Sequence, residues 1–440
     1  MGKGQIWETK PLDFWAKAKE LRAGWQKSIE SKEKVIAQGN TFGTLTCNWS
    51  AAFPALSLVE DNPVGAMMQS VAPAYARKAR LASEIRGWGR EICGYQGNCW
   101  GGQFLGYIED GTPWPDRKMV VPMPDVCDQH TKRGQQLRDF KNVPQWAGER
   151  FTYLGPFDEE RNSVFNEHKA YCNFKLLNDI ERIFGQPLDE EELYRQVDAE
   201  TKMYEYAGEI SELMARTIPT PLSVKDMFSV FTIGGLTKID PEASLKFWEM
   251  VRDEVKWRAE NHIAAVGNER FRWIEAHPPS WHYMKYYRYM EQYGAVCLGG
   301  EYPHHGCWKL NPDGSVGRRE HLMFPRDLEV KTREDIIRYA GGYDARLPEG
   351  FKMDEYLHKD GIVDFAKVFQ ADGALLAVWR HGVGCTLTRK AQGMYLREAG
   401  LSVMHYEGSA PGDRIDLDEK RLLDQLDMWM QSLGFRKFDD

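Results

Sequence analysis

The sequence lacks the signatures of membrane and secreted proteins. No run of about 18 apolar residues occurs, which argues against a membrane-spanning helix. The segment Met1–Trp7 contains no apolar stretch of the kind that forms the centre of a signal peptide. Eight cysteines in 440 residues are too sparse for a disulfide scaffold. We therefore expect a cytoplasmic chain with reduced thiols and no membrane partner.

The motifs that bind nucleotides or activate a serine nucleophile are also missing. The sequence contains no Gly-x-x-x-x-Gly-Lys-Ser/Thr phosphate loop, no Gly-x-Gly-x-x-Gly after a first strand and no Gly-x-Ser-x-Gly elbow. We therefore expect no ATP site in this chain, and a redox role would need electrons from a partner. The formal net charge is −8 with acidic and basic residues interleaved, which argues against nucleic acid as the main partner.

Short apolar runs of strand length alternate with helical periodicity in two parts of the chain. In the later part, a strand at 375–379 is followed by a glycine-containing loop, a helix at 386–398 and a strand at 401–406. In the earlier part, a strand at 118–124 runs into an acidic loop and a polar helix. The pattern predicts an α/β fold. Its segments are an N-terminal helical arm (1–40), a first α/β lobe (41–165), a helical connector (166–265) and a second α/β lobe (266–440).

Three cysteines lie in loops that flank or follow strand-like runs: Cys93 in a glycine-rich segment, Cys127 after the first-lobe strand and Cys385 after the second-lobe strand. In open α/β sheets, ligands bind at the carboxyl ends of the strands. No Cys-x-x-Cys pair is present, so the usual zinc-ribbon and ferredoxin signatures are missing. From spacing alone the three cysteines fit an iron–sulfur cluster, another metal site or ordinary thiols. Cys47 and Cys99 are possible fourth ligands.

The second α/β lobe begins with a strand predicted at 271–274, a helix at 280–292 and a strand at 295–298. A third loop of interest follows the last of these strands. It contains Glu301, His304 and His305 within five residues. Such a set can bind a divalent metal ion. The two histidines can also donate protons, because imidazole titrates near neutral pH. A polar loop without chemistry is the third interpretation.

Several segments, in order along about 350 residues, resemble the family of 2-hydroxyacyl-CoA dehydratases and benzoyl-CoA reductases. The order of the segments is the specific part of the resemblance, because the match at single residues is loose. The segments are 91–95 (Glu-Ile-Cys-Gly-Tyr), 125–128 (Asp-Val-Cys-Asp), 219–223 (Pro-Thr-Pro-Leu-Ser), the Cys385 loop with its helix, 400–408 (Gly-Leu-Ser-Val-Met-His-Tyr-Glu-Gly) and 413–414 (Asp-Arg).

The resemblance implies a subunit with two flavodoxin-like or Rossmann-like lobes and a [4Fe–4S] cluster held by Cys93, Cys127 and Cys385. The chain is similar in length and aromatic content to the larger cluster-bearing subunit of ATP-dependent benzoyl-CoA reductase. In such an enzyme, electrons enter the aromatic ring of a CoA thioester singly, alternating with protons, and yield a cyclohexadiene-carboxyl-CoA. Glu301, His304 and His305 are the candidate proton donors by loop position.

The same resemblance implies the partners. These are a second cluster-bearing subunit of the same family, separate ATP-hydrolysing iron–sulfur activator subunits, ferredoxin as the upstream donor and an aromatic acyl-CoA substrate. Two alternatives remain open: a 2-hydroxyacyl-CoA dehydratase subunit that eliminates water through a ketyl radical, and a non-catalytic iron–sulfur relay or scaffold subunit.

Overall fold

The fold was analysed in a computed structural model of the 440-residue chain. The structure describes residues 5–21, 34–38, 56–60, 73–89, 94–107, 111, 113, 119–121, 128–146, 159–231, 240–275, 280, 283–300, 308–310, 316–318, 332–335, 359–379, 389–408 and 418–438.

A parallel four-stranded sheet forms the centre of the C-terminal half. Its strands are β4 (Phe271–Glu275), β5 (Ala295–Gly300), β8 (Gly373–Trp379) and β9 (Ser402–Gly408), in the order β5-β4-β8-β9. Every residue of β4 and β5 is buried, as expected for a parallel sheet covered on both faces. The order reverses between β4 and β8, as in doubly wound folds. The predicted α/β class is therefore confirmed.

The described helices beside this sheet include α10 (Lys285–Glu291), α12 (Lys359–Val368), α14 (Arg389–Glu398) and α15 (Glu419–Ser432). The helix predicted at 386–398 corresponds to α14. It is followed by Gly400, whose φ of +89° favours glycine after a helix end. Trp429 of α15 donates a hydrogen bond of 2.7 Å to Ser402, which holds α15 beside β9.

A smaller parallel sheet belongs to the N-terminal half. It consists of β1 (Lys34–Gln38), β2 (Leu56–Glu60) and β3 (Met119–Val121) in the order β2-β1-β3. The prediction of helix throughout residues 1–40 was therefore wrong for β1, which pairs with both neighbouring strands. Residues 14–21 are helical, as predicted. An antiparallel pair, β6 (Trp308–Leu310) and β7 (Val316–Arg318), is separate from both sheets.

The glycine-rich segment predicted as a loop at 91–102 contains most of a helix instead. This helix is α4 (Gly94–Leu105), and it packs against α3 (Pro73–Glu84). A Cβ atom at Gly101 would lie 1.6 Å from the carbonyl oxygen of Ala79, so only glycine permits this approach of the two helices. The glycines of this segment therefore serve helix packing, which periodicity within one segment does not reveal.

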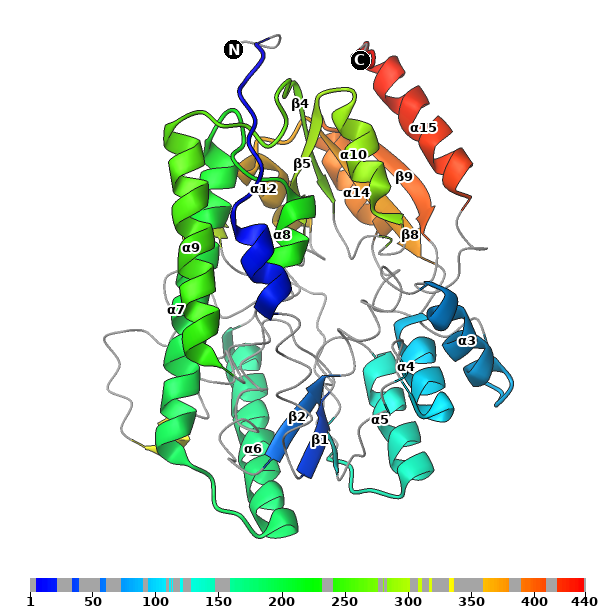
Figure 1. Ribbon diagram of the computed structural model, residues 1–440, viewed down its shortest axis with the longest axis vertical. Coiled ribbons are helices and arrows are strands. Elements are labelled where there is room, and N and C mark those ends of the chain that lie inside the picture. The colour runs from blue at the N-terminus through cyan, green and yellow to red at the C-terminus, as the bar shows by residue number, and fades with distance from the viewer. Residues whose placement is uncertain are drawn as a thin grey trace.

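Helices make up most of the described residues within 166–265, the segment predicted as a helical connector. They are α6 (Glu159–Phe184), α7 (Glu190–Arg216), α8 (Val224–Phe231) and α9 (Pro241–Glu260). The carboxylate of Asp189 accepts a hydrogen bond from the Glu192 backbone, and Asp240 caps α9 in the same way before Pro241. Figure 1 shows α7 and α9 running alongside the four-stranded sheet above and toward β1 and β2 below. The helix α5 (Asp128–Lys141) follows β3.

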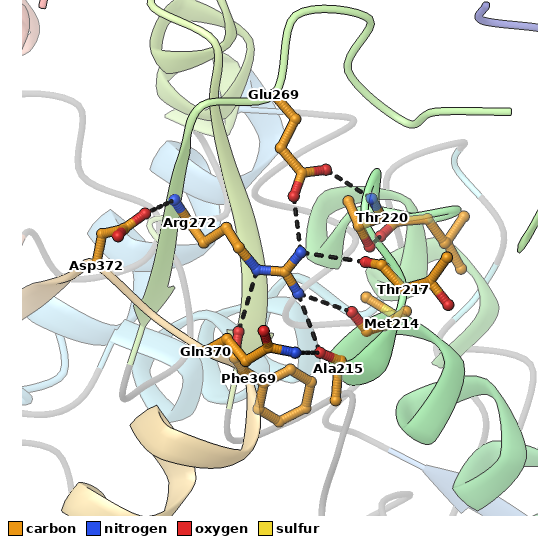
Figure 2. Close-up of polar contacts among 10 residues, drawn as sticks. Met214, Ala215, Thr217, Thr220, Glu269, Arg272, Phe369, Gln370 and Asp372 are labelled. Atoms are coloured by element: carbon orange, nitrogen blue, oxygen red, sulfur yellow. Dashed lines mark hydrogen bonds and ion pairs between the residues drawn. The ribbon is translucent and has the colours of Figure 1, made fainter. Parts of the chain in front are cut away.

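A buried arginine fixes the end of α7 to the four-stranded sheet. Arg272 of β4 donates to the carbonyl oxygens of Met214, Ala215 and Thr217, at the end of α7 where a cation is favourable. It also forms an ion pair of 2.7 Å with Glu269, and both side chains are less than 10% exposed. Figure 2 shows the guanidinium enclosed by these partners. Arg272 and its partners lie near the start of β4, whereas the candidate site described next lies at the carboxyl end of this strand.

Candidate functional site

The candidate site is defined by the carboxyl ends of the parallel strands. In Figure 1 the strands of both sheets point with these ends toward the middle of the molecule. The order reversal between β4 and β8 marks this edge as the place where doubly wound sheets bind ligands. β5 ends at Gly300, immediately before Glu301, and β8 ends at Trp379, six residues before Cys385.

The residues predicted to carry the chemistry lie outside the described residues. These are Cys93, Cys127, Cys385, Glu301, His304 and His305, together with Cys47. Within the described part of the chain, no group of three or more His, Cys, Asp or Glu side chains is arranged to hold a metal ion. The assignment of the three cysteines as cluster ligands therefore stays a prediction.

Two of the cysteines, Cys93 and Cys127, directly precede the first residue of a helix in the sequence. Gly94, next to Cys93, is the first residue of α4, and Asp128, next to Cys127, is the first residue of α5. The partial positive charge of a helix N-terminus stabilises a nearby thiolate. Cys99, a possible fourth ligand, is buried within α4. The positions of Cys93 and Cys127 along the chain therefore suit thiolate ligands.

A buried carboxyl group surrounded by tyrosines lies at the end of β4. Glu275 is the last residue of this strand and is completely inaccessible to solvent. Tyr286 of α10 and Tyr406 of β9 donate hydrogen bonds of 2.8 Å and 3.3 Å to Oε1 of Glu275. Tyr287 donates to its Oε2. Three hydroxyl groups from two different elements thus converge on one carboxyl group.

The surroundings of Glu275 place its pKa near neutrality. Burial raises the pKa to about 7, and the three tyrosine hydrogen bonds oppose this shift only in part. Burial also raises the pKa of each tyrosine well above its usual value, so the hydroxyl groups keep their protons. Among the described residues, no basic side chain forms an ion pair with Glu275. Glu275 can therefore change its protonation state at physiological pH.

This carboxyl group makes stability depend on pH. Between pH 4.5, the ordinary pKa of the group, and about pH 7, the folded state holds a proton that the unfolded state has released. The free energy of unfolding is therefore expected to fall as pH rises through this interval, by about 3 kcal/mol, and to change little above it. Urea unfolding of the wild type and of Glu275→Gln at several pH values measures this effect. If the free energy of unfolding depended on pH to the same extent in both proteins, the assignment of this effect to Glu275 would be wrong.

Sequence reasoning missed Glu275, although it predicted the strand. The prediction placed a strand at 271–274, and Glu275 follows directly as the first acidic residue after the apolar run. Tyr286 and Tyr287 lie in the helix predicted at 280–292, and Tyr406 ends the strand predicted at 401–406. An acidic residue at the carboxyl end of a buried strand was the available signal. Its three partners are 11, 12 and 131 residues away in sequence, so only the fold brings them together.

Comparison with known families identifies the class of protein. A family model described as 2-hydroxyglutaryl-CoA dehydratase, D-component, matches residues 71–422. The chain belongs to this family. The match runs from just before α3 into α15 and includes Cys93, Cys127 and Cys385. A search of curated proteins found no match.

Membership in the 2-hydroxyglutaryl-CoA dehydratase D-component family confirms the family-level resemblance found in the sequence. It supports an enzyme subunit in general terms, while the larger benzoyl-CoA reductase subunit remains a finer assignment. None of the helices within the described ranges is long and apolar enough to cross a lipid bilayer.

Proposed function

We propose that this chain is the iron–sulfur subunit of an ATP-dependent benzoyl-CoA reductase, with two flavodoxin-like lobes. The observation that carries the proposal is the family match over residues 71–422, which includes all three candidate cysteines. The strand orders β2-β1-β3 and β5-β4-β8-β9 support the two lobes. In each sheet the first strand along the chain lies between the second and the third, as in a doubly wound sheet. The reaction is the transfer of low-potential electrons to the aromatic ring of a CoA thioester.

A [4Fe–4S] cluster is the cofactor of this proposal. Cys93, Cys127 and Cys385 would hold it, since thiolates are the usual ligands of such clusters. The helix starts at Gly94 and Asp128 support two of these ligands. When bound, the cluster would supply single electrons at low potential.

The complex would supply what this chain does not. The sequence has no phosphate loop, so ATP hydrolysis is assigned to separate iron–sulfur activator subunits, with ferredoxin as the upstream donor. A second cluster-bearing subunit of the same family completes the complex, and we place it in the cytoplasm. The candidate proton donors of the loop after β5 remain Glu301, His304 and His305.

The second candidate function is that of a 2-hydroxyacyl-CoA dehydratase subunit. The description of the matching family, a dehydratase component, favours this reading. The two reactions differ in their products: the reductase forms a cyclohexadiene-carboxyl-CoA, whereas the dehydratase eliminates water from a 2-hydroxyacyl-CoA.

One assay of the anaerobically co-purified complex distinguishes these functions. Benzoyl-CoA and a 2-hydroxyacyl-CoA are supplied separately, each with ATP and a strong reductant, and the thioester products are analysed. The proposal predicts reduction of benzoyl-CoA that stops when ATP is omitted. Conversion of the 2-hydroxyacyl-CoA alone would establish the dehydratase instead. Conversion of neither thioester by a complex that contains the cluster would indicate a relay or scaffold subunit.

A further inference from the structure

We propose that Glu275 is a buried proton store, which acts through the hydroxyl groups of Tyr286, Tyr287 and Tyr406 to supply protons at the carboxyl edge of the four-stranded sheet. The proposal rests on the proposed function, because it assigns a source for the protons that accompany the electrons. It concerns a residue outside the loops that the sequence singled out.

Glu275 lies between the two strands that lead to the candidate loops. Glu275 pairs with Gly300 of β5, the residue immediately before Glu301. On its other side, Glu275 pairs with Leu375 of β8, the strand that leads toward Cys385. Glu275 thus ends an inner strand of the sheet, between β5, which ends beside it at Gly300, and β8, which continues from Leu375 to Trp379.

The contacts of Glu275 with the three tyrosines suit both of its protonation states. A completely buried carboxylate without a cation is costly unless hydrogen bonds satisfy it. Three tyrosine hydroxyl groups provide these bonds, two to Oε1 and one to Oε2. They can stabilise Glu275 after it has lost its proton, and burial favours its return to the neutral acid. The site therefore accommodates both protonation states, as a proton store requires.

The tyrosines link Glu275 to α10 and to β9. The rings of Tyr286 and Tyr287 stack at 4.3 Å, and the ring of Tyr406 lies 6.1 Å from that of Tyr286. Tyr406 pairs with Ala377 of β8, two residues before that strand ends. The tyrosine that bonds to Glu275 from β9 thus lies beside β8 near the carboxyl end of that strand, and we assign the hydroxyl groups as the carriers of the proton.

All titratable groups that face Glu275 in the described structure stay neutral near pH 7. They are the three tyrosines, from α10 and β9, and Cys297 of β5, whose pKa burial raises well above its usual value. Glu275 is therefore the one member of this described group that exchanges a proton near neutral pH.

The proton step balances with the electron step. An external low-potential donor loses one electron, and the thioester substrate gains it. The O–H bond of neutral Glu275 then breaks, a tyrosine hydroxyl takes this proton and releases its own toward the edge, and a bond to hydrogen forms on the substrate. Glu275 is left as a carboxylate, and a hydronium ion of the solvent returns a proton to it through the same hydroxyl groups and becomes water. Each cycle thus transfers one electron and one proton.

The test compares Glu275→Gln with Glu291→Gln in the anaerobically purified complex. Glu291 is a suitable control from the same helix because burial also raises its pKa, but its hydrogen-bonding partner is Arg288. We expect wild-type kcat to fall as pH rises through about 7. In Glu275→Gln, kcat should fall about 100-fold or more, with KM unchanged and this pH dependence lost. Wild-type kcat and an unchanged pH profile in Glu275→Gln would overturn the proposal.

Infrared spectroscopy tests whether the carboxyl group of Glu275 holds a proton near neutral pH. The measurement needs neither turnover nor a folded Glu275→Gln variant. The wild type should show a neutral buried carboxyl band at pH 6 that disappears by pH 8. Absence of this band would overturn the proposal. Tyr287→Phe, which keeps the carboxyl group, should shift the pH at which the band disappears upward, because one hydrogen bond to the carboxylate is lost. An inactive wild-type complex that shows the band would contradict the proposed function and support a protonated Glu275, so the two failures are distinguishable.

Discussion

Replacing Cys385 with serine is expected to remove the iron–sulfur cluster from the chain and to reduce activity to background. Thiolates bind cluster iron far better than a serine hydroxyl, which stays protonated at neutral pH. The loss should appear as missing visible absorbance and missing acid-labile sulfide in anaerobically purified protein. The same result is expected for Cys93→Ser and Cys127→Ser, because all three ligands are needed.

Cys172→Ser is the matched control for this experiment. Cys172 is partly buried in α6, where its sulfur lies 3.5 Å from His168, and it has no place in the proposed ligand set. The control should keep the cluster and the activity of the wild type. If Cys385→Ser kept a wild-type spectrum, or if Cys172→Ser lost the cluster to the same extent, the ligand assignment would be wrong.

Replacing Arg272 with methionine is expected to destabilise the protein by about 3–5 kcal/mol. The change removes a buried guanidinium that pairs with Glu269 and donates hydrogen bonds to carbonyl oxygens at the end of α7. Methionine has no donor that could replace these bonds. Glu269 would be left buried without its cation, and burial already raises the pKa of this carboxyl. Equilibrium unfolding in urea at neutral pH measures the loss.

An exposed ion pair with the same spacing provides the control. Arg195 and Glu192 are also three residues apart and also 2.7 Å from each other, but the side chain of Arg195 is 50% exposed. Arg195→Met should therefore cost less than about 1 kcal/mol. Similar losses in Arg195→Met and Arg272→Met would show that burial does not decide the strength of these pairs. A double variant of Arg272→Met and Glu269→Gln should recover part of the loss, because it removes the unpaired carboxylate.

The sequence predicted those elements whose signals lie within one segment. The two strands and the helix predicted around Cys385 appear as β8, β9 and α14, because apolar runs and the stop at Gly400 are local features. The caps at Asp189 and Asp240 are local features as well, since each side chain bonds to the backbone three residues later.

The errors and omissions depend on contacts between distant segments. The helix α4 was predicted as a loop because its glycines matter only where Gly101 meets Ala79 of α3. β1 was predicted as helix because its strand conformation depends on pairing with β2 and β3. Glu275 was missed because its tyrosines come from α10 and β9. The site cysteines lie outside the described residues and stay predictions.

The most direct test of the central claim is the iron and acid-labile sulfide content of the wild-type chain after anaerobic purification, measured together with its electron paramagnetic resonance spectrum. The account predicts about four iron atoms and about four sulfide ions per chain, with the signal of a reduced [4Fe–4S] cluster after addition of a strong reductant. A colourless chain without acid-labile sulfide would contradict the assignment of Cys93, Cys127 and Cys385, and with it both enzymatic functions considered for this protein.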